Sequence, residues 1–115
     1  MNGKEILLQA IQGKKTDRPA WLPFVGCHGG FLIGKTATEY LQSAALLIEG
    51  IKKAKSLYKP DGLPVMFDLQ IEAEILGCDL HWADEVPPAV TSHPLAQDKT
   101  IADLPELDET KGRFP

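Results

Sequence analysis

Residues 60–78 read PDGLPVMFDLQIEAEILGC, and this stretch decides how the chain is expected to fold. Its opening Pro-Asp-Gly is typical of a turn, and the apolar run 63–67 predicts a strand buried on both faces. Asp68 ends this run, and a helix is expected over 69–76, closed by Gly77 in a left-handed conformation. A buried strand with a carboxylate at its C-terminal end is the layout of a ligand site in a parallel α/β protein.

The chain before this stretch predicts the start of an alternating strand and helix pattern. A helix is expected over 2–13, because Asn2 is a good N-cap and apolar residues recur on one face before Gly13. A strand is expected over 21–25, although one proline inside it is unusual for a sheet. Helices are expected over 37–59, with one apolar inner stripe. This order of elements indicates a parallel sheet and an α/β fold.

The chain after this stretch predicts little regular structure. Residues 78–82 alternate in polarity and are typical of a small edge strand, whereas the double proline at 87–88 stops any regular element. Residues 89–94 give at most a short extended piece. We therefore expect 78–115 to be an irregular excursion from one α/β segment that spans residues 1–115.

The composition describes a small acidic domain. Hydrophobic residues make up 43% of the chain and charged residues 24%, and the net charge of −4 with a pI near 5.3 argues against a nucleic-acid partner. No apolar run approaches the about 18 residues that span a bilayer, and the N-terminus has no signal-peptide pattern. Cys27 and Cys78 lack CxxC spacing and are expected to be reduced thiols. We expect a cytoplasmic protein without membrane or nucleic-acid partners.

Residues 29–36 read GGFLIGKT and match the GxxxxGK[ST] pattern of a phosphate-binding loop. The loop follows one predicted strand and precedes a helix, as that motif requires. The bulky triplet at 31–33 argues against the motif, because a phosphate cradle needs successive backbone N–H groups turned inward, which small or polar residues permit. A stand-alone nucleotide-binding or assembly module that uses this loop is one alternative function.

Asp68 and His28 are the main candidate site residues, because each follows a predicted strand. The carboxyl ends of parallel strands form the face where such enzymes bind ligands, so both side chains are expected to line one pocket. Asp68 is the candidate catalytic residue, with capping of the following helix as its structural alternative. The alternative for His28 is a loop histidine bonded to local backbone. The candidate substrate-binding residues are His28, Gly29, Gly30, Phe31 and Phe67.

Several residues are of types that bind metals, but no pair of them has the spacing of a zinc site. We therefore predict that this segment binds no metal. The residues considered are Cys27, His28, Cys78, His81 and His93.

Several stretches resemble the uroporphyrinogen decarboxylase superfamily. Residues 4–21, KEILLQAIQGKKTDRPAW, look like the opening of its members, and residues 91–95, TSHPL, continue the resemblance. Residues 61–78, DGLPVMFDLQIEAEILGC, are most similar to its cobamide-dependent methyltransferase branch. The resemblance covers nearly the whole chain. It implies a (β/α)8 TIM barrel, of which this chain would be the N-terminal portion.

The resemblance to this branch implies methyl transfer between a corrinoid and a thiol, with a zinc ion that activates the thiol. It implies a corrinoid protein, or a small-molecule methyl donor and acceptor, as the partners of the whole enzyme. The zinc ligands of this branch lie in the later part of the barrel, so no cofactor is expected on residues 1–115 themselves.

Uroporphyrinogen decarboxylation is the alternative within the superfamily. Asp68 stands where the decarboxylases keep an aspartate that hydrogen-bonds the pyrrole N–H groups of the substrate. The decarboxylases also carry arginines after the first strand, which hold propionates, whereas residues 24–30 here read FVGCHGG. A substrate with many carboxylates would lack its counter-charges at this place. This departure favours methyl transfer over decarboxylation.

The length of the chain predicts an incomplete barrel. A (β/α)8 barrel takes about 250 residues, and two strands cannot close one. We expect this segment to be inactive as an enzyme by itself. We also expect it to associate with itself, because a partial barrel exposes apolar faces that rarely stay bare on a monomer.

Overall fold

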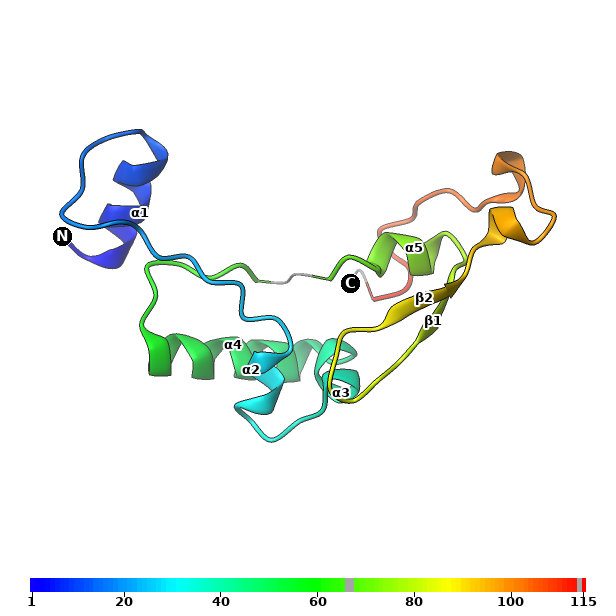
Figure 1. The fold of residues 1–115 in the computed structure, drawn as a ribbon, viewed down its shortest axis with the longest axis horizontal. Helices are drawn as coiled ribbons and strands as arrows, with labels where there is room; N and C mark the ends of the chain where they lie inside the picture. The colour runs from blue at the N-terminus through cyan, green and yellow to red at the C-terminus, as the bar shows by residue number, and fades with distance from the viewer. Residues whose placement is uncertain (66–67, 114) are drawn as a thin grey trace.

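The computed structural model describes residues 1–65, 68–113 and 115, and it shows an elongated molecule with a helical centre (Figure 1). The radius of gyration is 17.8 Å, and the extents are 56 × 35 × 22 Å. A compact domain of this length has a radius of gyration of about 13 Å. The described residues therefore do not wrap around one central core. Among them, no helix combines the length and the apolar character that crossing a membrane requires.

Helix α1 (Gly3–Ile11) lies at one end of the molecule and is closed by local signals on both sides. The Asn2 side chain accepts a hydrogen bond from the Glu5 N–H, and the Glu5 carboxylate accepts one from the Asn2 N–H. Gly13 has a φ of +68°, and the N–H of Lys14 bonds back to the ninth residue. This pattern is a Schellman motif. The predicted cap and the predicted stop are both confirmed.

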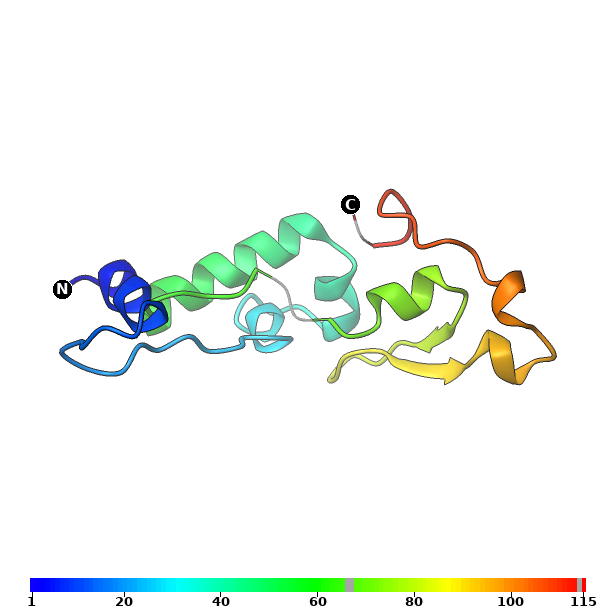
Figure 2. The ribbon, with the colours of Figure 1, turned by 90° about the horizontal axis from the view of Figure 1, so that it is seen from above.

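Three helices form the centre: α2 (His28–Phe31), α3 (Ala37–Leu41) and α4 (Ala44–Tyr58). Helix α4 runs along the molecule beside the extended segment that follows it (Figure 2). The helices expected over 37–59 are thus present as α3 and α4, with Ser43 capping the second. The buried apolar side chains of the described residues are few. They are Ile6, Ala37, Tyr40, Leu41 and Ala54.

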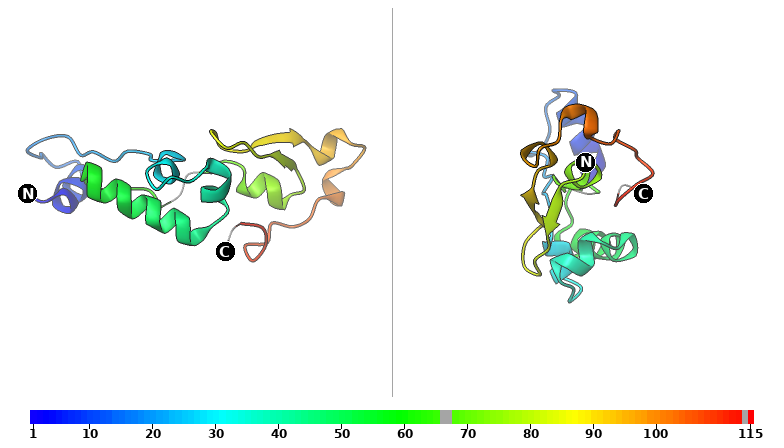
Figure 3. Two further views of the ribbon diagram at one scale, coloured as in Figure 1. Left: turned by 90° about the horizontal axis from the view of Figure 1, so that it is seen from below. Right: turned by 90° about the vertical axis from the view of Figure 1, so that its right-hand side faces the viewer.

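The other end carries α5 (Ile71–Ile75) and a two-stranded antiparallel sheet of β1 (Asp79–His81) and β2 (Ala89–Ser92). Gly77 has a φ of +96° at the end of α5, as predicted. Seen from below, α1, α4 and α5 follow one another along the long axis (Figure 3). The short 3-10 helices η1 (Pro94–Ala96) and η2 (Ile101–Asp103) come next. Residues 78–115, expected to be irregular, thus contain the sheet that the structure describes.

The strand predicted over 21–25 is wrong, because these residues are extended but belong to no sheet. Residues 63–65 are also outside any strand, and residues 66–67 of that prediction lie outside the described part of the chain. The backbone N–H of Asp61 donates to the carbonyl of Trp21 at 3.0 Å. The next rung of a parallel ladder would need the N–H of residue 23, and Pro23 has none.

The two extended segments nevertheless lie side by side and run in the same direction. Asp61 contacts Trp21, a Cβ added at Gly62 would meet Leu22, and Val25 and Val65 line one small cavity. The described parts of these predicted neighbours are therefore adjacent, and the described sheet includes neither of them.

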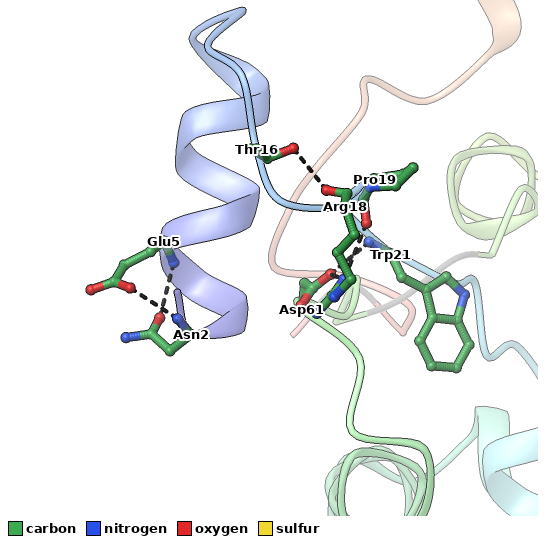
Figure 4. Close-up of polar contacts among 7 residues, drawn as sticks. All are labelled: Asn2, Glu5, Thr16, Arg18, Pro19, Trp21 and Asp61. Carbon is green, nitrogen blue, oxygen red and sulfur yellow. Dashed lines mark hydrogen bonds and ion pairs between the residues drawn. The ribbon is translucent and has the colours of Figure 1, made fainter.

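An ion pair fixes the start of this arrangement. Figure 4 shows Arg18 reaching Asp61 while the backbone N–H of Trp21 donates to the same carboxylate at 2.8 Å. The loop after α1 is thus held against the segment that follows α4.

Candidate functional site

Asp68, the predicted catalytic residue, is almost fully buried, with a side chain that is 1% exposed. One carboxylate oxygen accepts the backbone N–H of Gln70 at 2.8 Å, and the other accepts a guanidinium N–H of Arg113. The bond to Gln70 stabilises the turn that leads into α5. Asp68 is not the N-cap of α5, because that position is held by Gln70 and carries no side-chain cap, so the capping alternative is not borne out. Both oxygens of Asp68 have protein partners.

Arg113 forms hydrogen bonds with several residues around Asp68. Its Nε–H donates to Glu74 at 2.8 Å, and its Nη1 also donates to the carbonyl of Leu41 at 3.3 Å. Its guanidinium carbon lies 4.8 Å from the ring centroid of Trp82. Burial lowers the pKa of Arg113, but the hydrogen bonds with Asp68 and Glu74 outweigh it, so this pKa lies above its ordinary value. The guanidinium is permanently charged.

One nitrogen of this guanidinium is left over. Nη2 of Arg113 is buried and has no hydrogen-bond partner. Arg113 lines an open cavity of about 520 Å³, together with Tyr40, Gln42 and Ser43. Buried donors without partners are rare in native proteins, because each costs the free energy of removing it from water. The cluster around Arg113 is therefore not fully satisfied.

Cys27, which follows the first extended segment, lies near enough to Asp68 for the carboxylate to affect its pKa. Burial raises the pKa of the Cys27 thiol, and the negative charge of Asp68 raises it further. Burial and the neighbouring Cys27 likewise raise the pKa of Tyr40. Cys27 is thus a neutral thiol beside a carboxylate at neutral pH.

His28 contacts a different part of the molecule. Its Nε2 lies 2.6 Å from the hydroxyl of Tyr58, and the two ring centroids are 5.7 Å apart. No described contact joins His28 to Asp68, so their common pocket stays a prediction. The contact partner of His28 is a side chain of α4, and not the local backbone.

The predicted glycine loop is largely helical and serves close packing. Gly29 and Gly30 are buried, and a Cβ at Gly30 would lie 2.7 Å from Tyr40. A Cβ at Gly50 of α4 would lie 2.5 Å from the carbonyl oxygen of Gly29. These glycines therefore allow α2 to pack closely against α3 and α4, so the close approach that they permit is one between helices. Of the other predicted substrate contacts, Phe31 is half exposed and Phe67 lies outside the described residues.

The structure argues against the phosphate-binding alternative for residues 29–36. Every backbone N–H from 28 to 35 donates to a carbonyl of the same segment, and Gly34 closes α2 at a φ of +71°. The N–H of Thr36 is bonded to the carboxylate of Glu39, and Lys35 lies 3.9 Å from the same carboxylate. No inward row of free N–H groups exists in this segment. These internal hydrogen bonds argue against a phosphate-binding loop, because they use the donors that a phosphate would need.

Metal-binding side chains do not converge in the part of the chain that the structure describes. No three His, Cys, Asp or Glu side chains there could hold one ion. Cys78 and His93 come closest, with 4.0 Å between Sγ and Nδ1. The zinc ion implied by the methyltransferase resemblance thus has no ligand set among these residues.

The described residues form a small mixed arrangement of helices with one two-stranded antiparallel sheet. A family model described as Uroporphyrinogen decarboxylase (URO-D) matches residues 2–115, and the chain belongs to this family. The family implies a TIM-barrel fold, and the described elements are consistent with part of such a domain. No curated protein and no solved structure gave a match.

Proposed function

We propose that this chain forms part of a URO-D family enzyme that transfers a methyl group between a corrinoid and a thiol. In the net reaction the thiol gains the methyl group and releases its proton, while the corrinoid keeps the electron pair of the broken bond. The corrinoid would supply the methyl chemistry, and residues of this chain would line the substrate site.

The state of the two arginines in the sequence supports this proposal over porphyrin decarboxylation. Arg18 forms a two-pronged pair with Asp61, and Arg113 is bound by Asp68 and Glu74. Both guanidinium groups are thus already paired with carboxylates of the protein, whereas the carboxylates of a uroporphyrinogen would need arginine partners of their own. A substrate that carries many negative charges therefore has no counter-charge of this kind on the described residues.

The state of Asp68 supports the same choice. In this structure one oxygen of Asp68 accepts the N–H of Gln70 and the other accepts a guanidinium N–H of Arg113, so Arg113 holds the position that a pyrrole N–H would take. Asp68 would contribute first by placing α5 and Cys27 at the mouth of the site. His28 and Phe31 would line the approach to it from α2.

Equilibrium dialysis of the enzyme that contains this chain, against methylcobalamin and against uroporphyrin, tests this proposal. We expect the protein to retain methylcobalamin, with no saturable retention of uroporphyrin. Saturable uroporphyrin binding that Arg113→Gln abolishes would overturn the proposal. Conversion of uroporphyrinogen to products with fewer carboxylates would overturn it as well and would establish the decarboxylase alternative.

A further inference from the structure

Residues 105–113 form a strap that returns along the chain toward α5 (Figure 1). Within the described part of the chain, every hydrogen bond that ties this strap to earlier residues is donated by Arg113. The other polar contacts of the strap are local, such as those of Asp108 with Thr110 and Lys111. Arg113 therefore supplies the described hydrogen bonds that hold the strap, while the neighbouring Gly112 lies beside Ile75 of α5.

The Arg113 side chain is surrounded by groups that would also bind a free guanidinium. Arg113 presents N–H groups to Asp68, Glu74 and the carbonyl of Leu41, and its planar group lies against Trp82. Two carboxylates, a carbonyl oxygen and an aromatic face are the partners that a free guanidinium or amidinium would also seek.

We propose that Arg113 is a releasable latch: the strap closes over Asp68 through Arg113, and Asp68 accepts N–H groups of a ligand only after Arg113 withdraws. The ligand class that competes for this position carries several N–H donors on a planar cation. This inference rests on the proposed function in one respect, since it takes Asp68 to face the substrate site.

The geometry explains why the latch can open. Opening lets water reach both Asp68 and Arg113, so neither charge is left buried and unpaired, which is the costly outcome for a buried ion pair. The closed state already carries the unpartnered Nη2 of Arg113. Gly112, next to Arg113, has a φ of +62°, a conformation that glycine adopts without strain.

A fluorescence titration tests the latch directly. In a Trp21→Phe background Trp82 is the remaining tryptophan of the sequence, so its emission reports occupancy of the position beside its ring. The variant Arg113→Ala is titrated with ethylguanidinium chloride, and ethylammonium chloride at the same ionic strength is the control. We expect saturable binding, and in the intact protein a midpoint raised at least about tenfold, because a tethered group competes at an effective concentration in the millimolar range.

Two further variants make the result decisive. Arg113→Lys keeps one charge but loses the planar fork, and it should also bind ethylguanidinium if Arg113→Ala does not fold. Adding Asp68→Asn to the alanine variant should weaken binding at least about tenfold, because the carboxylate partner is lost. An unsaturable response in both Arg113 variants, or a response unchanged by Asp68→Asn, would overturn the latch.

Opening of the strap can also be measured in the unmodified chain, by limited proteolysis. Ethylguanidinium should speed cleavage after Glu109 by a glutamate-specific protease, while cleavage after Glu85 in the turn between β1 and β2 keeps its rate. Equal acceleration at both sites would contradict the latch. These experiments use neither corrinoid nor porphyrin, so they can fail or succeed independently of the proposed reaction.

Discussion

Arg18 and Asp61, 43 residues apart in the chain, meet in a two-pronged ion pair with nitrogen–oxygen distances of 2.6 and 2.7 Å (Figure 4). The Asp61 side chain is 2% exposed, whereas that of Arg18 is half exposed. The hydrogen bonds from Arg18 and from the Trp21 backbone lower the pKa of Asp61 from 3.8 to about 2. This pair holds the loop after α1 against the segment that follows α4.

The lowered pKa of Asp61 predicts a loss of stability in acid. Because the folded protein holds the carboxylate ionised, the stabilisation is present above pH 3.8 and is lost as the pH falls toward about 2. Asp61→Asn should lower the urea midpoint of unfolding at neutral pH. The difference in midpoint between this variant and the unmodified protein should become smaller in acid. Asp17→Asn, which removes one charge from the same loop, should leave the midpoint unchanged. A gap that stays constant down to about pH 3 would contradict this assignment.

Replacing Gly50 by alanine distinguishes two opposing effects on the free energy of unfolding, helix propensity and packing. Alanine at an interior helix position normally gains about 1 kcal/mol over glycine. Here the new Cβ would lie 2.5 Å from the carbonyl oxygen of Gly29, which is backbone and cannot rotate away. Overpacking costs about 1–3 kcal/mol, so Gly50→Ala should lower the free energy of unfolding. Ser56→Ala, at an exposed position of α4, is the matched control and should be neutral or slightly stabilising in a urea melt.

The raised pKa of Cys27 predicts slow alkylation. In a Cys78→Ser background, iodoacetamide at mildly alkaline pH should modify Cys27 more slowly than a free cysteine, because the thiolate is the reactive form. Asp68→Asn removes the negative charge that disfavours this thiolate and should speed the reaction. Asp61→Asn, which removes a carboxylate elsewhere, should not. An unchanged alkylation rate in Asp68→Asn would show that the charge of Asp68 does not affect the Cys27 thiol.

The bonded N–H groups of residues 28–35 predict no response to nucleotide. A ligand at a hundredfold excess over its dissociation constant stabilises a protein by about 2.7 kcal/mol. We expect ATP or GTP with magnesium to leave the melting temperature unchanged, and Lys35→Ala to melt like the unmodified protein. A nucleotide-dependent rise that disappears in Lys35→Ala would restore the phosphate-binding reading.

Exposed apolar side chains lead us to propose self-association. Trp21, Leu22, Val65 and Leu69 are about half to three-quarters exposed along the paired segments and the turn that follows. Apolar patches of this kind rarely stay uncovered on a monomer. Sedimentation equilibrium at micromolar concentrations should show a dimer or a larger assembly. Replacing Val65 and Leu69 by serine should shift it toward monomer, and a monomeric unmodified chain with a cooperative melt would exclude the idea.

Sequence reasoning predicted the helices where local signals end them. Asn2 and Gly13 bound α1, and Gly77 ends α5, because a cap or a left-handed glycine acts within a few residues of its own position. The same reasoning failed for residues 21–25. A strand depends on a hydrogen-bonding neighbour, and Pro23 removes the donor that the next rung requires.

The candidate site was only partly predictable for the same reason. Asp68 could be found, because a carboxylate directly after an apolar run is a local pattern. Arg113, 45 residues away, could not, since an ion pair between side chains leaves no periodicity in the sequence. The glycines at 29 and 30 suggested a ligand loop, whereas their partner is Tyr40 of the neighbouring helix. That contact depends on packing between elements, which the segment alone does not encode.

The distance along the chain between Asp68 and Arg113 also sets an order of assembly during translation. The capped helices α1 and α4 can form as soon as they leave the ribosome, because their stop signals are already present. Asp68 must wait for another 45 residues before its guanidinium partner is synthesised. During that interval the carboxylate is hydrated and Trp82 is uncovered on the nascent chain. The contact between Asp68 and Arg113 is therefore made later in synthesis than the caps of α1 and α4.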